Sequence, residues 1–414
     1  MGFHKKSIWR TDNTFQFIDK IDWSTSIDFR KAIFGAVNHR GYSDIVLDFS
    51  GVKKAYPNGI VPIITEIDAY KKVGVDFSLI PPSNPEVESL FSNNSWFYHI
   101  EPRKFPEFIT TNKSSHMALK KFDDDNQLNE LVNCAVEICL QQLVFAQGVP
   151  QAFEWVINEL AGNVLVHAGN SSGWIQVTTY KESHRLAIVV CDGGVGIPKT
   201  ISEKFNVKND NEAIELAIQK GVTSKPDFGQ GNGLAGAIAI AQHSKGMLAL
   251  TSGKGRVRVL EGNVEPKNNF PPLSGTVVEM QFDTDKEIDL PKALWGHEPV
   301  DYFETKYEDY DMEESVFTLR EYASSFGNRI TGERIRNLVV NLIGQTDGKS
   351  VRINMENVSV ISSSFADELF GKLFVELGPI DFSRVIKFKA MNPTCKSIID
   401  HAVAQRVSQT FNLQ

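Results

Sequence analysis

Short apolar strands alternate with helices near both ends of the chain, and this alternation constrains the fold most strongly. The first copy runs through "DIVLDF" (44–49), a helical segment at 60–74 and a strand at 75–80. Near the C-terminus, "VRINMENV", "SSSFADELFGKLFVELG", "RVIKFKAMNP" and "TCKSIIDHAVAQR" repeat the strand–helix order. Such alternation predicts parallel or mixed sheets backed by helices. Because the two ends share little identity, they are either an internal repeat or two unrelated α/β units.

Charge, hydropathy and cysteine usage exclude several classes of protein. The net charge of −8 disfavours a broad nucleic-acid-binding surface. No run of about 18 apolar residues predicts a membrane span, and the N-terminal sequence lacks a secretory signal. The four cysteines are scattered without a C-x-x-C pair, which argues against a disulfide framework or a zinc site. We therefore expect a cytoplasmic protein that has neither a membrane nor a nucleic acid as its partner.

A helix in the middle of the chain carries an unusual polar stripe. In "INELAGNVLVHAG" (157–169), Glu159, Asn163 and His167 recur every four residues, on a different face from the apolar stripe that begins at Phe153. Pro150 suits the first turn of such a helix, and another helix is predicted before it at 126–147. A solvated face would explain three polar residues at this spacing equally well.

Two glycine-rich loops follow the polar stripe. "LAIVVCDGGVGIP" is an apolar strand that ends in Asp192, where a carboxylate can accept a hydrogen bond from an exocyclic amine. Gly194 and Gly196 would let a flat ring lie against bare backbone, although a tight turn also fits this pattern. "SKPDFGQGNGLAGAIAIAQ" places several glycines before a helix N-terminus, where anions bind readily. It is neither a dinucleotide fingerprint nor a P-loop.

These motifs occur in a specific order over residues 115–283: E-x-x-x-N helix, D-G-G-x-G loop, G-x-G-x-G loop, and the Gly-Thr step of "SGTVVEMQF" (274–282), which we expect to close the sheet. The order resembles the GHKL ATPase superfamily, and "NELAGNVLVHAG" is most similar to its anti-sigma-factor serine kinases. The resemblance implies a Bergerat-type ATP-binding α/β sandwich with a mixed sheet, using ATP and Mg²⁺. Because the 126–147 helix contains no histidine, a sensor histidine kinase is disfavoured.

The resemblance also implies a role for each motif residue. Glu159 would activate the attacking water or hydroxyl, and Asn163 would ligate Mg²⁺. Asp192 would bind the adenine amine with support from Thr276. The glycines divide into those lining the adenine, Gly194 and Gly196, and those of a lid over the phosphates, Gly229, Gly231 and Gly233. Lys225 either reaches the phosphates from the lid or is an exposed loop lysine.

The two ends resemble STAS domains, the fold of anti-sigma-factor antagonists. In antagonist STAS domains a serine between strand and helix is phosphorylated, and this position falls on Ser364, or the adjacent Ser363, in the C-terminal copy. In the N-terminal copy it falls on Asn58, which accepts no phosphate. The serines at 362–364 could instead cap the following helix.

We therefore predict an α/β (α+β) protein with four parts: a STAS-like domain (1–112), the ATP-binding domain (115–283), an acidic linker (284–312) and a C-terminal STAS-like domain (313–414). The expected function is regulatory, with an ATPase or serine-kinase-like core that couples nucleotide state to STAS-like modules. The alternative is a non-catalytic ATP-sensing scaffold. A DNA-directed ATPase is disfavoured by the acidic charge and the lack of a transducer domain. Expected partners are proteins, such as a STAS or sigma-regulator-like protein, or a second copy of the chain.

Overall fold

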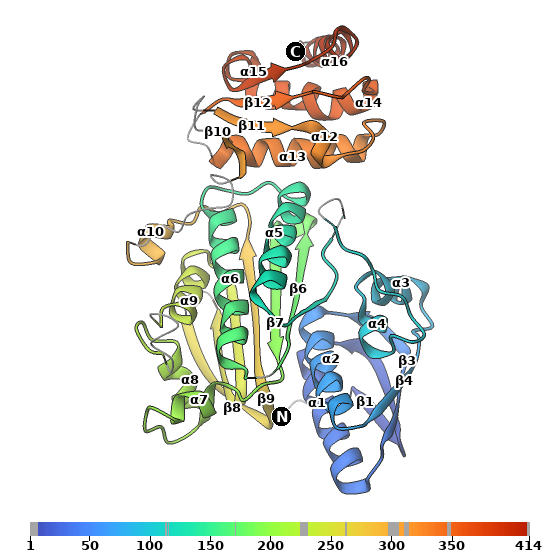
Figure 1. Cartoon of the computed structure of the whole chain (residues 1–414), viewed down its shortest axis with the longest axis vertical. Helices are drawn as coiled ribbons and strands as arrows, with labels where there is room; N and C mark the ends of the chain where they lie inside the picture. Colours follow the sequence, from blue (N-terminus) through green and yellow to red (C-terminus); the bar gives the residue numbers. More distant parts are fainter. Residues whose placement is uncertain are drawn as a thin grey trace.

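The chain folds around three β-sheets, one in each third of the sequence (Figure 1). The computed structural model describes residues 7–111, 114, 116–169, 171–223, 231–260, 263–296, 306–309, 314–345 and 349–411. The central sheet is antiparallel and the outer two are mixed, which confirms the predicted α/β class. Within the described part of the chain, no helix combines the length and the hydropathy needed to cross a membrane.

The N-terminal sheet has the order β1-β2-β3-β4, with β1 antiparallel to β2 and the remaining pairs parallel. The strand predicted at 44–49 is part of β3, inside the sheet, and the strand predicted at 75–80 is β4, at its edge. The sequence analysis did not predict β1, β2 or α1. The elements are β1 (Ile8–Thr11), β2 (Thr14–Ile21), α1 (Trp23–Phe34), η1 (Gly35–His39), β3 (Asp44–Ala55), α2 (Pro57–Lys72), β4 (Asp76–Ile80), α3 (Pro85–Asn93) and α4 (Trp96–Ile100).

The C-terminal sheet repeats this connectivity. Its order is β10-β11-β12-β13, again with one antiparallel pair followed by two parallel pairs. The two ends of the chain therefore share a topology, as an internal repeat requires. The elements are β10 (Glu308–Asp309), β11 (Glu314–Thr318), α12 (Leu319–Tyr322), α13 (Arg329–Gln345), β12 (Val351–Asn354), α14 (Ser363–Ala366), η3 (Asp367–Gly371), α15 (Lys372–Val385, interrupted at Gly378), β13 (Ile386–Lys389) and α16 (Pro393–Phe411).

The central sheet has the order β5-β6-β7-β9-β8. Residues 274–282 belong to β9, the last strand of this sheet along the chain, which lies inside the sheet between β7 and β8, so that β8 forms the edge. Residues Val277 and Val278 point to opposite faces and both are buried, as an inner strand requires. The elements are β5 (Lys120–Phe122), α5 (Asp125–Gln142), α6 (Val149–His167), β6 (Gly173–Tyr180), η2 (Lys181–Ser183), β7 (Arg185–Asp192), α7 (Ile197–Ser202), α8 (Asp210–Ala217), α9 (Gly233–His243), β8 (Met247–Leu260), β9 (Asn263–Asp283) and α10 (Leu290–Ala293).

The helix predicted at 126–147 ends five residues early. Helix α5 stops at Gln142, because Leu143 is extended, with φ −131° and ψ 151°. The short connection to α6 lets α5 and α6 lie side by side on one face of the central sheet (Figure 1). The helix predicted from Pro150 is confirmed, and its apolar stripe is buried against the sheet.

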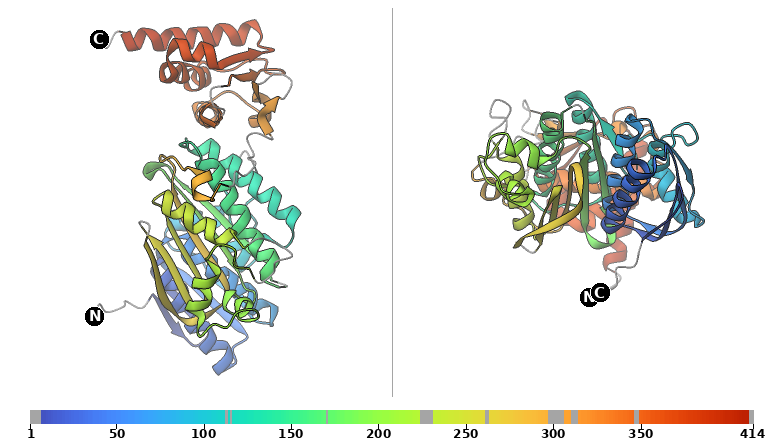
Figure 2. Two further views of the ribbon diagram at one scale, coloured as in Figure 1. Left: turned by 90° about the vertical axis from the view of Figure 1, so that its left-hand side faces the viewer. Right: turned by 90° about the horizontal axis from the view of Figure 1, so that it is seen from below.

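The N-terminal domain covers the opposite face of the central sheet, beside it in the view from below (Figure 2). On β7, the outward residues Val189 and Cys191 belong to the same apolar cluster as the N-terminal core. The amide nitrogen of Asn58, at the start of α2, donates to both carboxylate oxygens of buried Glu279, at 3.1 and 3.2 Å. Arg256 stacks 4.4 Å from the centroid of the Trp23 ring. Strand β8 is therefore not a fully solvated edge of the sheet, because its Arg256 contacts the N-terminal domain.

Replacing Asn58 with aspartate is expected to weaken this docking. The new carboxylate would face the carboxylate of Glu279 in a buried contact, so we expect the free energy of unfolding to fall by about 2 kcal/mol at neutral pH. Chemical denaturation of the full chain measures the change. The same substitution at Asn38, which is exposed and bonds only Tyr70 there, is the control and should change stability by less than about 0.5 kcal/mol. Equal effects at both sites would contradict the contact.

The C-terminal domain docks through α13 onto the end of α5 (Figure 1). The side-chain amide of Asn341 donates to the carbonyl oxygens of Leu140 at 2.9 Å and Leu143 at 2.8 Å, and accepts from the N–H of Phe145 at 2.7 Å. One turn earlier, Asn337 donates to the carbonyl oxygen of Gln141 at 3.2 Å. A helix end leaves its last carbonyls without intrahelical partners. The C-terminal domain therefore supplies the caps that α5 lacks.

Candidate functional site

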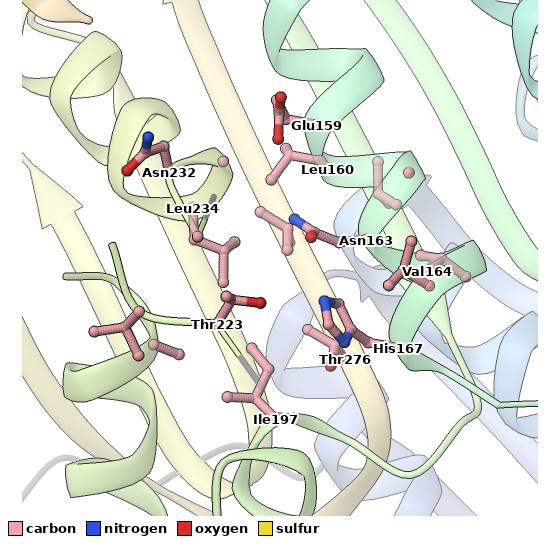
Figure 3. Close-up of a pocket in the computed structure, with 18 of the residues that line it drawn as sticks. Glu159, Leu160, Asn163, Val164, His167, Ile197, Thr223, Asn232, Leu234 and Thr276 are labelled. Carbon is pink, nitrogen blue, oxygen red and sulfur yellow. The ribbon is translucent and has the colours of Figure 1, made fainter. Parts of the chain in front are cut away.

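A cavity of about 880 Å³ lies between α6, α7 and α9, over the strands β7 and β9 (Figure 3). Most of the residues that the sequence analysis singled out line it together: Glu159, Asn163, Asp192, Gly196, Gly231, Gly233 and Thr276. Gly194 lies next to the cavity, in the loop after β7. Gly229 and Lys225 lie outside the described residues, so the structure does not place them.

Helix α6 forms one wall of the cavity and directs its polar stripe inward. Figure 3 shows Glu159, Asn163 and His167 one above another on the cavity side of this helix. The polar stripe therefore lines a cavity rather than an open outer face of the helix. The amide nitrogen of Asn163 is buried and has no hydrogen-bond partner among the described residues. A buried polar atom without a partner is costly, so this nitrogen points to a ligand in the cavity.

Asp192 stands at the opposite end of the cavity, where β7 ends. Its carboxylate is 5% exposed and accepts the N–H of Gly194 at 2.8 Å. Thr276 lies directly opposite it on β9. Burial raises the pKa of Asp192 to about 6, although the backbone N–H groups of Gly194 and Thr276 favour the ionised form. The site therefore holds a carboxylate ready to accept a further hydrogen bond.

Bare backbone forms the floor beside Asp192. Gly196 has φ +78°, and a Cβ there would lie 2.8 Å from the hydroxyl oxygen of Ser252 and 3.1 Å from the carbonyl oxygen of Gly275. A Cβ on Gly194 would overlap the backbone of Ala168. Neither position tolerates a side chain, because each glycine packs closely against neighbouring protein atoms, and the loop after β7 is thereby held against the sheet and the end of α6.

The C-terminal end of the second glycine loop packs closely against residues 221 and 222. Gly231 has φ +71°, and a Cβ there would lie 2.5 Å from the backbone of Val222. The N–H of Gly221 donates to the carbonyl oxygen of Gly231 and to the side chain of Asn232, at 3.1 Å each. The loop delivers Gly233 at the first position of α9, where a Cβ would overlap the carboxylate of Glu159 and lie 3.5 Å from the amide nitrogen of Asn163. Thus α6 and the N-terminus of α9 meet at these two side chains.

Several residues of the site escaped the sequence analysis. The buried hydroxyl of Ser252 accepts the N–H of Ile197 at 2.9 Å and donates to the carbonyl oxygen of Gly275 at 2.7 Å, so it joins α7 to the β9 turn. Trp155 and Trp295 line the far end of the cavity. A single serine at the end of a strand pattern carries no signal, and only the position of Trp155 on the α6 pattern could have suggested its inclusion.

The two ends of the cavity differ in chemistry. A buried carboxylate over bare backbone suits a base that carries an amine, and a helix N-terminus beside an unpaired amide suits phosphate oxygens. The fold and site therefore define a nucleotide-binding domain. A family model described as histidine kinase-, DNA gyrase B- and HSP90-like ATPase matches residues 148–286, and a STAS-like domain of unknown function matches residues 331–396. No curated protein matches the chain.

The chain thus contains a GHKL-type ATPase domain followed by a STAS-like domain. Ser364 lies in the latter, on α14. The N-cap of α14 is Ser362, which accepts the N–H of Phe365 at 3.0 Å, and Ser364 lies 3.0 Å from it, oxygen to oxygen. Figure 1 shows α14 in the C-terminal domain, far from α9.

Replacing Asp192 with asparagine is expected to stabilise the ligand-free protein. The folded-state pKa of about 6 lies above the ordinary value of 3.8, so the folded state holds the proton more tightly and the free energy of unfolding falls as pH rises between these values. At pH 7.5 the ionised carboxylate costs about 3 kcal/mol, which asparagine would remove. Thermal unfolding from pH 4 to 8 measures the difference, which should vanish near pH 4. A variant less stable than the parent at pH 7.5 would contradict the burial argument.

Proposed function

We propose that the chain is a regulatory protein whose central domain binds ATP with Mg²⁺ and hydrolyses it, relaying nucleotide state to flanking STAS-like modules. The observation that carries the proposal is the convergence of Glu159, Asn163 and Asp192 on one cavity. It is supported by the family match over 148–286, because GHKL ATPase domains bind ATP, generally with Mg²⁺.

The residues present fit ATP and Mg²⁺. Asp192 would accept the adenine amine, while Gly194 and Gly196 leave the adenine face open to the backbone, and Thr276 supports Asp192. Asn163 would ligate Mg²⁺ through its amide oxygen, because amide oxygens suit this hard cation, and would donate from its unpaired nitrogen to a phosphate oxygen. Mg²⁺ neutralises charge on the phosphates when bound. Gly231 and Gly233 would lie over the phosphates, as would Gly229 and Lys225.

Water is the acceptor that we propose. The carboxylate of Glu159 lies beside Gly233 at the N-terminus of α9, as does the Asn163 amide, and from this position Glu159 would orient a water and take its proton. Ser364 is the competing acceptor within the chain. Its place on α14, in the domain held to α5 by Asn341, would require that domain to undock before Ser364 could approach Glu159. Transfer to Ser364 therefore remains the second outcome of the test.

We also propose that residues 1–112 form a second STAS-like domain. Their sheet has the same strand order and directions as the sheet that contains the family-matched segment 331–396. Asn58 occupies the place of the phosphorylated serine of antagonist STAS domains, and its contact with Glu279 supports a fixed docking role. By this proposal the external partner is a protein of the STAS or sigma-regulator kind.

The competing function is an ATP-sensing scaffold without catalysis. It is favoured by one observation: both flanking domains are docked through buried polar contacts, at Glu279 and at Asn341, as a scaffold needs. The two functions differ in turnover and not in binding.

The test is to incubate the full chain with γ-labelled ATP and Mg²⁺, following free phosphate and protein-bound label together. We expect free phosphate without label in the parent and in Ser364→Ala, and neither binding nor turnover in Asp192→Asn. Label that disappears in Ser364→Ala would identify self-phosphorylation instead. Binding without either product would favour the scaffold, and no binding would refute a nucleotide site.

A further inference from the structure

The segment Leu290–Gly296 connects the ATPase domain to the C-terminal domain and also forms part of the cavity wall. It comprises α10 and the three residues after it, of which Leu294, Trp295 and Gly296 line the cavity. The side chain of Asp289 caps α10 by accepting the N–H of Lys292 at 3.0 Å. Neither family match includes this segment, since the first ends at 286 and the second begins at 331.

Leu294 lies where α6 and α9 meet. On α9, a Cβ at Gly236 would overlap the ring of Trp155 from α6 and lie 3.0 Å from a methyl carbon of Leu294. The absence of a side chain at Gly236 therefore lets α9 lie against the indole of Trp155. Leu294 packs beside the same glycine. Because α9 begins at Gly233, beside Glu159 and Asn163, a shift of its N-terminus displaces the contact with Leu294.

Trp295 holds an unfavourable backbone conformation in the cavity wall. Its φ is +55°, a region that bulky residues rarely adopt, and its side chain is 46% exposed. The ammonium of Lys220, another residue of the cavity wall, lies 4.6 Å from the centroid of its ring. Strained residues persist where the surroundings hold them, and they concentrate at binding sites and switches.

The other end of this connection is fixed to α5. Lys306, the first residue described after Gly296, forms an ion pair with the buried carboxylate of Glu137 on α5. The hydroxyl of Tyr307 then meets that of Tyr322 at 2.7 Å, inside the C-terminal domain. Helix α13 of this domain caps the end of α5 through Asn341. The connection is thus attached at one end to the cavity and at the other to the docking contact.

We propose that Leu294 and Trp295 belong to the nucleotide site, at its phosphate end, and that through them nucleotide binding strengthens the docking of the C-terminal domain on α5. The inference rests on the proposed function, because it needs a nucleotide in the cavity. A nucleotide that contacts Trp295 and the N-terminus of α9 would stabilise the packing of Leu294 and Trp295 in the cavity wall, and the C-terminal domain, which follows this segment in the chain, would dock more firmly on α5 as a result. Linkage is reciprocal, so docking must strengthen nucleotide binding by the same factor.

The amide of Phe145 reports docking directly, because it donates across the interface to Asn341. Hydrogen exchange at this amide is measured in the full chain, with and without Mg²⁺ and a non-hydrolysable ATP analogue. We expect the analogue to slow exchange at least about fivefold, the lower range of allosteric couplings. Binding of the analogue with unchanged or faster exchange would overturn the inference and leave the proposed function standing. Absence of binding would overturn both.

Two variants close the thermodynamic cycle. Trp295→Ala should abolish the slowing of Phe145 exchange and weaken analogue binding, whereas Trp9→Ala, an exposed tryptophan of the N-terminal domain, should change neither. Asn341→Leu lies outside the cavity, yet it should weaken analogue binding, measured by calorimetry, by the factor seen in the exchange experiment. Unchanged affinity in Asn341→Leu would overturn the linkage even if Trp295→Ala failed to fold.

Discussion

Replacing Glu159 with glutamine is expected to lower ATP turnover by about 10²–10⁴-fold while affinity for the nucleotide changes only a few-fold. The side chain faces the cavity from α6, and its carboxylate lies against Gly233 at the N-terminus of α9. A glutamine fills the same volume but cannot take a proton from water. Phosphate release under single-turnover conditions measures the chemistry, and calorimetry with a non-hydrolysable analogue measures the affinity.

The matched control for this prediction is Glu154→Gln, on the same helix but outside the cavity wall. It should leave turnover within about twofold of the parent. If Glu159→Gln also retained turnover within tenfold of the parent, Glu159 would not be the base, and another group would have to orient the water. If the parent itself released no phosphate, the scaffold would be the better description.

Asn341→Leu is expected to lower the free energy of unfolding by about 4 kcal/mol. The asparagine is 1% exposed, and its removal leaves the carbonyls of Leu140 and Leu143 and the N–H of Phe145 buried without partners. Each unsatisfied group costs about 1–3 kcal/mol, partly offset by the apolar side chain. Because the chain has several domains, the measurement is the first transition in a guanidinium titration followed by circular dichroism.

Asn93→Leu is the control for that substitution, since Asn93 is exposed and its amide bonds only the hydroxyl of Ser89. We expect a change within about 0.5 kcal/mol there. A loss below about 1 kcal/mol in Asn341→Leu would mean that water reaches the end of α5, and that the C-terminal domain docks less tightly than these contacts indicate.

Periodicity predicted the elements whose pattern is local. The strand at 186–191 was predicted because apolar runs bounded by turns are typical of buried strands, and it is present as β7 in the central sheet. Strand β2 has a comparable signal in the alternation of Phe15 and Phe17, both fully buried, which the analysis overlooked. The early end of α5 was not predictable, because its last carbonyls are capped by residues about 200 positions later in the chain.

The same distinction holds for the residues of the site, where those in local motifs were predictable and those placed by long-range packing were not. Glu159, Asn163, Asp192 and Thr276 were found because each belongs to a motif with a fixed local spacing, and the motifs occur in a recognisable order. Trp295 belongs to no motif, since its place in the wall depends on where the chain passes after the sheet is complete. Asn341 is a polar residue among apolar ones on its helix, and the sequence alone does not show which helix end it caps.

The two faces of strand β7 contact different parts of the molecule. Asp192 faces the cavity, while its neighbours Cys191 and Val189 are covered by the N-terminal domain. The family-matched segment 148–286 therefore omits the N-terminal domain that covers this face of the sheet. Cut at those borders, it would leave an apolar sheet face open to water. In this chain the family-matched segment and the packed unit have different boundaries, because the unit also includes the N-terminal domain.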